Sequence, residues 1–343
     1  MTLRRILKVA IALLAWQFAS NLADAATRYH LVKTIKASDS ADTWDFQTID
    51  AKARRLYVSH LSEVIVVDVD TGEVVGKIPN TDGVHGVAVA ADLGRGFISI
   101  GHTDSVAIFD LKTLKRIADV KVGENPDAIV YDPASHRVLS FNGNTNDATV
   151  IEAASGKVAG TIDIGGRPEA AVADGKGNVY LDIVDKNLVL QIDSFNSKVL
   201  NRWPTTLCDR PTSLDIDPKG VRLFVGCRNL VLAVYDSHDG HFIATATIGD
   251  NVDTTAFDAA TGLIFSSTGD GIVTIIHQDS RDKYSLAEVV KSHDGSKTMA
   301  LDPRTHKIFV PSGDVKFLPP EKTGDRPKKT IVSGTFAILV FAK

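Results

Sequence analysis

Residues 45–78 read DFQTIDAKARRLYVSHLSEVIVVDVDTGEVVGKI. Four short apolar segments alternate with turn residues in this stretch, which predicts strands over residues 46–49, 56–59, 63–68 and 73–78. The third segment is almost continuously apolar, as expected of a strand that is buried on both faces. Asp70-Thr71-Gly72 is typical of the hairpin turn that joins a third strand to a fourth. The stretch therefore predicts one four-stranded sheet.

The same pattern recurs along the rest of the chain. The first strands of successive units begin near Asp45, Gly86, Asp127, Glu169, Thr212, Thr254 and Thr298, so the units are 41 to 44 residues apart. An aspartate that can initiate the next turn recurs in each unit. These aspartates are Asp50, Asp92, Asp132, Asp174, Asp217, Asp258 and Asp302. Stacked helical repeats are excluded because the segments are short and rich in Val and Ile. Seven such units predict an all-β protein, a seven-bladed β-propeller of four-stranded blades.

The two ends of the chain indicate how the ring closes. Residues 335–341 resemble a third strand of the repeat, residues 29–35 resemble a fourth, and the seventh unit lacks an outer strand of its own. We therefore expect the N-terminal strand to complete the last blade, which removes an open sheet edge. Residues 312–334 form an insertion between the second and third strands of this blade. An insertion of this length is either functional, covering the channel or contacting a partner, or a mobile tether.

Composition narrows the class of protein. The 343 residues include 38 Lys and Arg against 42 Asp and Glu, with a net charge of −4 and 44% hydrophobic residues. Such a composition is that of a globular protein rather than a disordered one. Nucleic-acid binding is not expected, because no cluster of Lys and Arg provides a face for phosphates. The 26 Gly and only 2 Met favour many turns and few long helices.

The first 25 residues have the features of a secretory signal peptide. Arg4, Arg5 and Lys8 precede an apolar run over residues 9–22, and Ala23-Asp24-Ala25 is a small-x-small cleavage pattern. The alternative is an uncleaved N-terminal anchor. No later segment is long enough to be a transmembrane helix. We therefore predict export to a periplasm or the cell exterior, with residues 26–343 forming the mature propeller, which we expect to be a monomer.

The first unit also resembles a known family. Arg55-Leu56-Tyr57-Val58-Ser59-His60, followed by Val64-Ile65-Val66-Val67-Asp68 and Thr71-Gly72, is similar to the YVTN-repeat propellers, and most of all to the exported YncE-like proteins. Later units depart from the namesake motif, for example Phe97-Ile98-Ser99. The resemblance implies a propeller over the whole mature chain. It implies no single function, because such propellers include binding proteins, enzymes and surface-layer components.

A propeller with this strand order places the candidate site on one face. The first strand of each unit is innermost, and the loops that enter it share the channel face with the loops between the second and third strands. Candidate ligand-binding residues on the entering side are Asp45, His85, Asp127, Arg167, Glu169, Arg210, Asp253 and Lys297. Such groups can bind a peptide or a small polar ligand through hydrogen bonds and charge pairing. The alternative is a solvated rim.

Three histidines suggest a metal site on the same face. His60, His85 and His102 belong to the first two units, so the ring can bring them together. Imidazoles with Asp45 or Asp127 nearby suit a transition metal such as Cu or Zn. The alternative is that three polar loop residues face water, since no closely spaced histidine pair sets the geometry.

Two classes of function remain open. The favoured one is a binding or scaffold propeller that recognises a small ligand, a metal or a protein partner on the channel face. The alternative is an enzyme: a metal-dependent hydrolase similar to propeller lactonases, using Glu169, Asn142 and Asp253, or a quinoprotein-like dehydrogenase. No Gly-x-Ser-x-Gly motif or haem-attachment motif occurs, and catalytic residues are not assigned.

The two cysteines predict a disulfide. Cys208 precedes the first strand of the fifth unit and Cys227 ends its second strand, so both lie on the same face of neighbouring strands. An even number of cysteines in an exported chain favours a bridge. The alternatives are two buried free thiols or thiol ligands of a metal.

Overall fold

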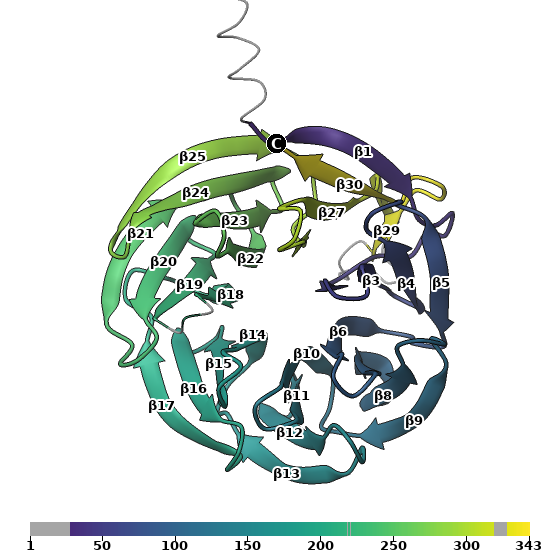
Figure 1. Ribbon diagram of the computed structural model, residues 1–343, viewed down its shortest axis with the longest axis horizontal. Coiled ribbons are helices and arrows are strands. Elements are labelled where there is room, and N and C mark those ends of the chain that lie inside the picture. The colour runs from purple at the N-terminus through teal and green to yellow at the C-terminus, as the bar shows by residue number, and fades with distance from the viewer. Residues whose placement is uncertain (1–27, 218, 220, 319–327) are drawn as a thin grey trace, which may run out of the picture.

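Seven four-stranded antiparallel sheets surround a central channel, as predicted (Figure 1). The computed structural model describes residues 28–217, 219, 221–318 and 328–343. The predicted signal peptide, residues 1–25, lies outside them. Among the described residues no helix is long and apolar enough to span a membrane. The one helical element of this part of the chain is the short 3-10 turn η1 (Gly101–Thr103).

The first six blades each follow the chain from the channel outward. Blade 1 contains β2 (Gln47–Asp50), β3 (Arg55–His60), β4 (Glu63–Asp68) and β5 (Val74–Pro79). Blade 2 contains β6 (Val84–Ala90), β7 (Arg95–Ile100), β8 (Ser105–Asp110) and β9 (Arg116–Lys121). Blade 3 contains β10 (Pro126–Asp132), β11 (Arg137–Asn142), β12 (Asp147–Glu152) and β13 (Val158–Asp163).

The next three blades repeat this order. Blade 4 contains β14 (Pro168–Ala173), β15 (Asn178–Ile183), β16 (Leu188–Asp193) and β17 (Lys198–Pro204). Blade 5 contains β18 (Pro211–Ile216), β19 (Arg222–Cys227), β20 (Val231–Asp236) and β21 (Phe242–Thr247). Blade 6 contains β22 (Val252–Asp258), β23 (Leu263–Thr268), β24 (Ile272–Ser280) and β25 (Lys283–Lys291).

Blade 7 joins the two ends of the chain, which confirms the predicted closure (Figure 1). From the channel outward it contains β26 (Ala300–Leu301), β27 (Ile308–Ser312), β30 (Ala337–Ala342) and the N-terminal β1 (His30–Lys36). β1 pairs antiparallel with β30, and Ile35 stands opposite Ile338. The ring is thus closed by hydrogen bonds between the first strand and the last.

The hydrophobic core lies between neighbouring blades rather than at the centre of the ring. In β4, the side chains of Val64 to Val67 are fully buried, because both faces of this strand meet other sheets. Leu56 of blade 1 packs in one cluster with Phe309 and Ile35 of blade 7, so the closing strand contributes to the core. Tyr57 faces Phe109 of blade 2, with ring centroids 5.7 Å apart. Each blade is therefore stabilised by its neighbours, as expected of a repeat protein.

The recurring aspartates initiate turns, as predicted, and some of them also connect blades. Asp132 accepts hydrogen bonds from the backbone of its own turn and from the Ser194 hydroxyl of blade 4. Asp258 Oδ2 is bonded to His306 Nδ1 of blade 7 at 2.6 Å. Blade 2 differs, because Ala90 occupies this register position and Asp92 lies two residues later in the turn. The sequence repeat thus marks contacts between sheets as well as turns.

The insertion in blade 7 contains a two-stranded hairpin. It pairs β28 (Val315–Leu318) with β29 (Lys328–Ile331), and residues 319–327 lie outside the described part of the chain. The hairpin base is bonded to the segment that leads into blade 1: Thr330 donates its hydroxyl to the Ala41 carbonyl, and Ser333 donates to the Asp39 carbonyl. The insertion is therefore attached to the N-terminal segment.

Candidate functional site

Seven residues, one from each blade, occupy equivalent positions at the start of the innermost strand or just before it. In blades 2 to 6 the position is the second residue of the strand. In every blade except blade 2 it lies five residues before the recurring aspartate. We call these residues the channel ring: Asp45, His85, Asp127, Glu169, Thr212, Asp253 and Lys297. Six of the seven were predicted as channel-face residues.

The backbone is irregular at the ring positions of five blades. In blades 2 to 6 the pairing register between the first and second strands shifts across the ring residue, for example between Val84 and Val87 around His85. Such β-bulges redirect a side chain and are frequent beside functional sites. The bulges explain why polar side chains at these positions are presented to the channel mouth while the strands below them continue into the core.

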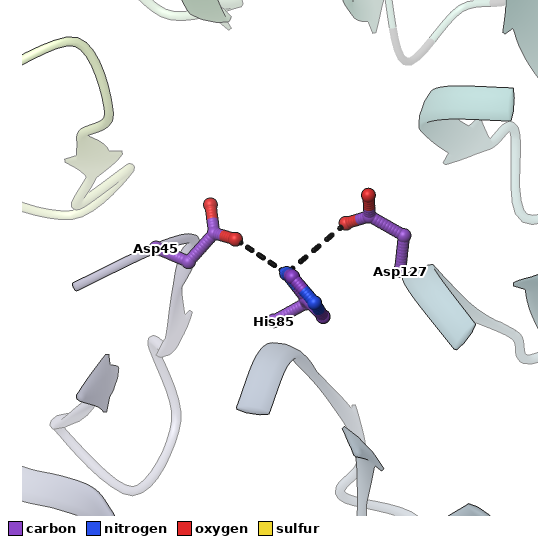
Figure 2. Close-up of side chains that lie close together, drawn as sticks. All are labelled: Asp45, His85 and Asp127. Carbon is purple, nitrogen blue, oxygen red and sulfur yellow. Dashed lines mark hydrogen bonds and ion pairs between the residues drawn. The ribbon is translucent and has the colours of Figure 1, made fainter. Parts of the chain in front are cut away.

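Asp45, His85 and Asp127 come together at the mouth of the channel. His85 Nδ1 lies 2.7 Å from Asp45 Oδ2 and 3.7 Å from Asp127 Oδ1, so both carboxylates face the same ring nitrogen (Figure 2). About a quarter of each side chain remains exposed, at 26%, 28% and 22% respectively. The other edge of the imidazole lies over Gly101 of η1, where a Cβ would be only 2.9 Å from Nε2. The glycine thus provides the space that His85 occupies.

Burial and the neighbouring charges shift the pKa values of His85 and Asp127. Burial alone would lower the pKa of His85, but the hydrogen bond with Asp45 and the negative charge of Asp127 outweigh it and raise the pKa to about 9. Burial raises the pKa of Asp127 to about 7, with His85 opposing the rise and Asp45 adding to it. The neighbouring carboxylates thus favour the protonated imidazole, whereas burial favours the neutral form of Asp127.

In blades 5 to 7, ion pairs and hydrogen bonds connect the ring residues with Arg228. Asp253 is almost fully buried, and its two oxygens lie 2.5 Å from Lys297 Nζ and 3.3 Å from Arg228 Nη2. Burial raises the pKa of Asp253 to about 6, although Lys297 opposes the rise. Arg228 also donates from Nε to the Thr212 hydroxyl at 3.2 Å. Asp253 thus lies between two cations, whereas Asp45 and Asp127 share a single histidine.

The predicted disulfide is present, and it lies next to Arg228, one of the two partners of Asp253. Cys208 and Cys227 are bonded, and their Cα atoms are 5.4 Å apart. Arg228 directly follows Cys227, and its backbone N–H donates to the carbonyls of Asp209 and Arg210. The bridge therefore joins the two loops that carry Arg228 and Arg210 beside the channel.

A small cavity continues from the ring into the channel. Its volume is about 160 Å³, and it is lined by one or more residues that follow each ring position in six blades. Its wall includes Gly86, Ala128, Ala170 and Ser213. Small side chains at these positions keep the space open. The ring therefore stands at one end of a partly open space, which shares the lining residues Thr48, Val87, Ile129 and Ala171 with a larger space of about 420 Å³ further along the same strands.

The other sequence candidates occupy different surroundings. His60 ends β3 and is fully buried, with its ring centroid 4.3 Å from that of Phe336 and neither ring nitrogen hydrogen-bonded within the described residues. Burial lowers the pKa of His60, so it is a neutral core residue. His102 is exposed on η1. Of the three histidines, only His85 belongs to a group of potential ligand atoms within 4.8 Å of one another in the described part of the chain.

Arg167 and Arg210 lie on the exposed rim rather than in the ring. Arg167 Nη2 is 3.5 Å from Glu169 Oε2, and the backbone N–H of Arg210 donates to the Asn187 side chain. Two further residues were not among the sequence candidates: Thr212, a ring member, and Gly101, under His85. Thr212 can be found from its spacing, because it lies five residues before Asp217. No sequence pattern identifies Gly101, since its role depends on the neighbouring strand.

Comparison with solved structures identifies the class of protein as a β-propeller. The hydrazine synthase of Kuenenia stuttgartiensis is similar with a TM-score of 0.69 and 18% identity, over 79% of this chain and 93% of that chain. The Cps50 (Swd1) β-propeller domain of Myceliophteria thermophila has a TM-score of 0.71 and 12% identity, over 92% and 100%. A chain of a mitotic checkpoint complex has a TM-score of 0.73 and 15% identity, over 89% and 93%.

These identities show a shared fold and nothing finer. No protein-family model and no curated protein matches the chain.

Proposed function

We propose that this chain is an exported binding propeller of the YncE-like type, which recognises a small polar ligand or ion at its channel ring. The observation that carries the proposal is the ring itself: a polar or charged residue at one equivalent position in each of seven blades, presented by bulges in five of them. Export is supported by the signal-like sequence of residues 1–25 and by the disulfide, because bridges persist in oxidising compartments.

The size of the space directly below the ring favours a small ligand over a drug-sized one at that position. Pockets for drug-sized molecules usually measure roughly 300–1,000 Å³. The cavity below the ring, at about 160 Å³, is about the size of an engineered cavity that binds benzene. The entrance is charged, so the ligand that suits it is an ion or a small polar molecule. A protein partner would instead contact the exposed rim, which includes Arg167 and Arg210.

The hydrolase alternative is less well supported by the positions of its residues. It requires Glu169, Asn142 and Asp253 to share one metal ion. The Asn142 amide is buried and donates to Asp147 and Thr149. Asp253 is bonded to Lys297. Asp253 is therefore already neutralised by a cation, and Asn142 is held in place through its Nδ2 although its Oδ1 has no hydrogen-bond partner among the described residues, so we favour binding over catalysis.

A panel of defined compounds tests the proposal. The mature protein is unfolded thermally in the presence of Zn²⁺, Ca²⁺, inorganic phosphate, acetate, ethanolamine and glycine, each added separately. We expect at least one compound to raise the melting temperature of the parent protein, since a ligand that binds only the native state stabilises it. The same compound should have no effect on a variant with Asp45→Asn and Glu169→Gln. If none of the panel changes the melting temperature, the channel ring is not a binding site for small polar ligands.

A further inference from the structure

We propose that Asp45, His85 and Asp127 form a binding site for a divalent transition-metal ion. The inference rests on the proposed binding function and names the ligand class. The three potential ligand atoms lie within 4.8 Å of one another, and the residues come from three consecutive blades. Figure 2 shows the two carboxylates on either side of the imidazole, with one oxygen of each directed at the same ring nitrogen.

The distances between the potential ligand atoms are close to those that one ion requires. Metal–nitrogen and metal–oxygen bonds of about 2.0–2.2 Å place two ligand atoms of one ion roughly 3.0–3.5 Å apart. The distance from His85 Nδ1 to Asp45 Oδ2 is slightly shorter than this, at 2.7 Å, and that to Asp127 Oδ1 slightly longer, at 3.7 Å. The two carboxylate oxygens also lie within 4.8 Å of each other, so side-chain rotations can bring all three atoms to the distances that one ion requires. The ion takes the place of the hydrogen between Nδ1 and Asp45, and that proton leaves to solvent.

The types of ligand indicate the kind of metal. One imidazole nitrogen with two carboxylate oxygens suits Zn²⁺ and neighbouring transition metals, whereas Ca²⁺ and Mg²⁺ prefer oxygen alone. Three protein ligands leave at least one coordination position for water or a small ligand. That position faces the channel, because about a quarter of each side chain remains exposed there. A bound ion would thus lie at the entrance of the cavity.

The surrounding charges favour a cation between Asp45 and Asp127 over the other positions in the ring. Asp253 is already paired with Lys297 and Arg228. Glu169 lies beside Arg167, at 3.5 Å. Among the described residues, His85 is the one ion-pair partner of Asp45 and Asp127, and a doubly charged ion with a neutral imidazole balances both carboxylates. The site is therefore neutral when the metal is bound.

A second group with the same residue types provides a matched control. Asp236, Asp239 and His241 also lie within 4.8 Å of one another, on the outer part of blade 5. Asp236 is bonded to Arg222 at 2.5 Å, so its charge is compensated, and Asp239 and His241 are more than half exposed. We expect this group to contribute nothing to metal binding at a single high-affinity site.

The experiment is a titration of metal-free mature protein with Zn²⁺, followed by calorimetry and by elemental analysis after gel filtration. We expect one Zn²⁺ per chain in the parent and in His241→Gln, and an affinity at least tenfold lower in both His85→Gln and Asp127→Asn. Circular dichroism of the metal-free variants establishes that they are folded. If His85→Gln does not fold, Asp127→Asn and the visible absorption of Co²⁺ added to the parent and to His241→Gln decide instead.

Two results would overturn the assignment. One is a parent protein that retains no Zn²⁺ and shows no Co²⁺ absorption. The other is a Zn²⁺ affinity that is unchanged in His85→Gln and in Asp127→Asn, whether or not it is lost in His241→Gln. If ethanolamine, phosphate or another compound of the panel binds at the ring while Zn²⁺ does not, the metal site is wrong and the proposed binding function remains.

Discussion

Arg54 and Asp302 form a two-pronged ion pair across the junction at which the ring closes. Arg54 lies in the first turn of blade 1 and Asp302 at the corresponding turn of blade 7, 248 residues apart in the chain. The guanidinium nitrogens lie 2.8 and 2.6 Å from the two carboxylate oxygens. Asp302 is fully buried and Arg54 is 13% exposed. The pair therefore connects the first and last blades on the face opposite the channel ring.

Removing this carboxylate should weaken the whole ring. We expect Asp302→Ala to lower the free energy of unfolding by about 3 kcal/mol, because a buried guanidinium loses its main partner. The measurement is equilibrium denaturation in urea. Asp70→Ala is the matched control: Asp70 contacts the same Arg54 but is 54% exposed, and its removal should cost much less. Equal losses in both variants would contradict a special role for the closing pair.

The same pair predicts a sensitivity to acid. Burial alone would raise the pKa of Asp302, but hydrogen bonds from Arg54 and Thr305 outweigh it and lower the pKa from 3.8 to about 2. The folded pKa is below the unfolded one, so the stabilisation is present above about pH 4 and is lost as the pH falls toward 2. Its size is about 2 kcal/mol. Unfolding measured from pH 5 to 2 should show a shallower decline in Asp302→Asn than in the parent, and parallel curves would reject this assignment.

The closing strand should contribute through its buried side chain. Ile35 of β1 is 4% exposed and packs in the core cluster with Leu56 and Phe309, whereas Leu31 of the same strand is 49% exposed. We expect Ile35→Ala to reduce the free energy of unfolding by about 3 kcal/mol, and Leu31→Ala to change it by less than about 0.5 kcal/mol. Urea denaturation of the two variants checks the difference. Similar values for both would show that the strand does not stabilise the ring through the core.

Loss of the disulfide should destabilise blade 5 and its loops. In the chain-entropy model a loop of the length between Cys208 and Cys227 corresponds to roughly 3 kcal/mol. We expect the double variant Cys208→Ala, Cys227→Ala to unfold at a lower urea concentration than the oxidised parent. A reducing agent should lower the stability of the parent and leave the double variant unchanged. A parent protein that is indifferent to reduction would contradict the prediction.

Gly101→Ala should disturb the channel ring without removing a charged group. The added methyl would lie 2.9 Å from His85 Nε2 and 2.7 Å from Asn125 Oδ1, so the His85 ring must move. We expect the affinity for Zn²⁺ to fall about tenfold, as is usual when the support of a metal ligand is altered. Gly160→Ala is the control, since a Cβ there has no heavy atom within 4 Å. Unchanged Zn²⁺ affinity in Gly101→Ala would show that Gly101 does not position His85.

Much of the fold follows from local patterns. The strands of blade 1 begin and end within a residue or two of the predicted positions, since a continuous apolar run such as Val64 to Val67 is compatible only with a strand buried on both sides. The repeat length then dictates seven blades, and the unpaired end strands dictate the closure. The bridge between Cys208, in the loop before β18, and Cys227, at the end of the neighbouring β19, agrees with the prediction from their places in the repeat.

The candidate site was only partly predictable. The sequence placed Asp45, His85 and Asp127 on the channel face, because the repeat determines which end of each strand they occupy. It also placed His60 there, but the last residue of β3 turns into the core, where Phe336 packs against it from the other end of the chain. Whether a residue at a strand end faces the channel or the neighbouring blade depends on the bulges and on the neighbour, which a local pattern does not contain.

The number of blades, their strands and the closing strand follow from local sequence patterns, because they depend on periodic burial and on turn residues that act over a few positions. The contacts of Asp45 and Asp127 with His85, of Lys297 with Asp253 and of Arg54 with Asp302 arise only when the blades pack together. These contacts join residues that are 40 to 248 positions apart, and their geometry depends on the angle and spacing at which complete blades pack.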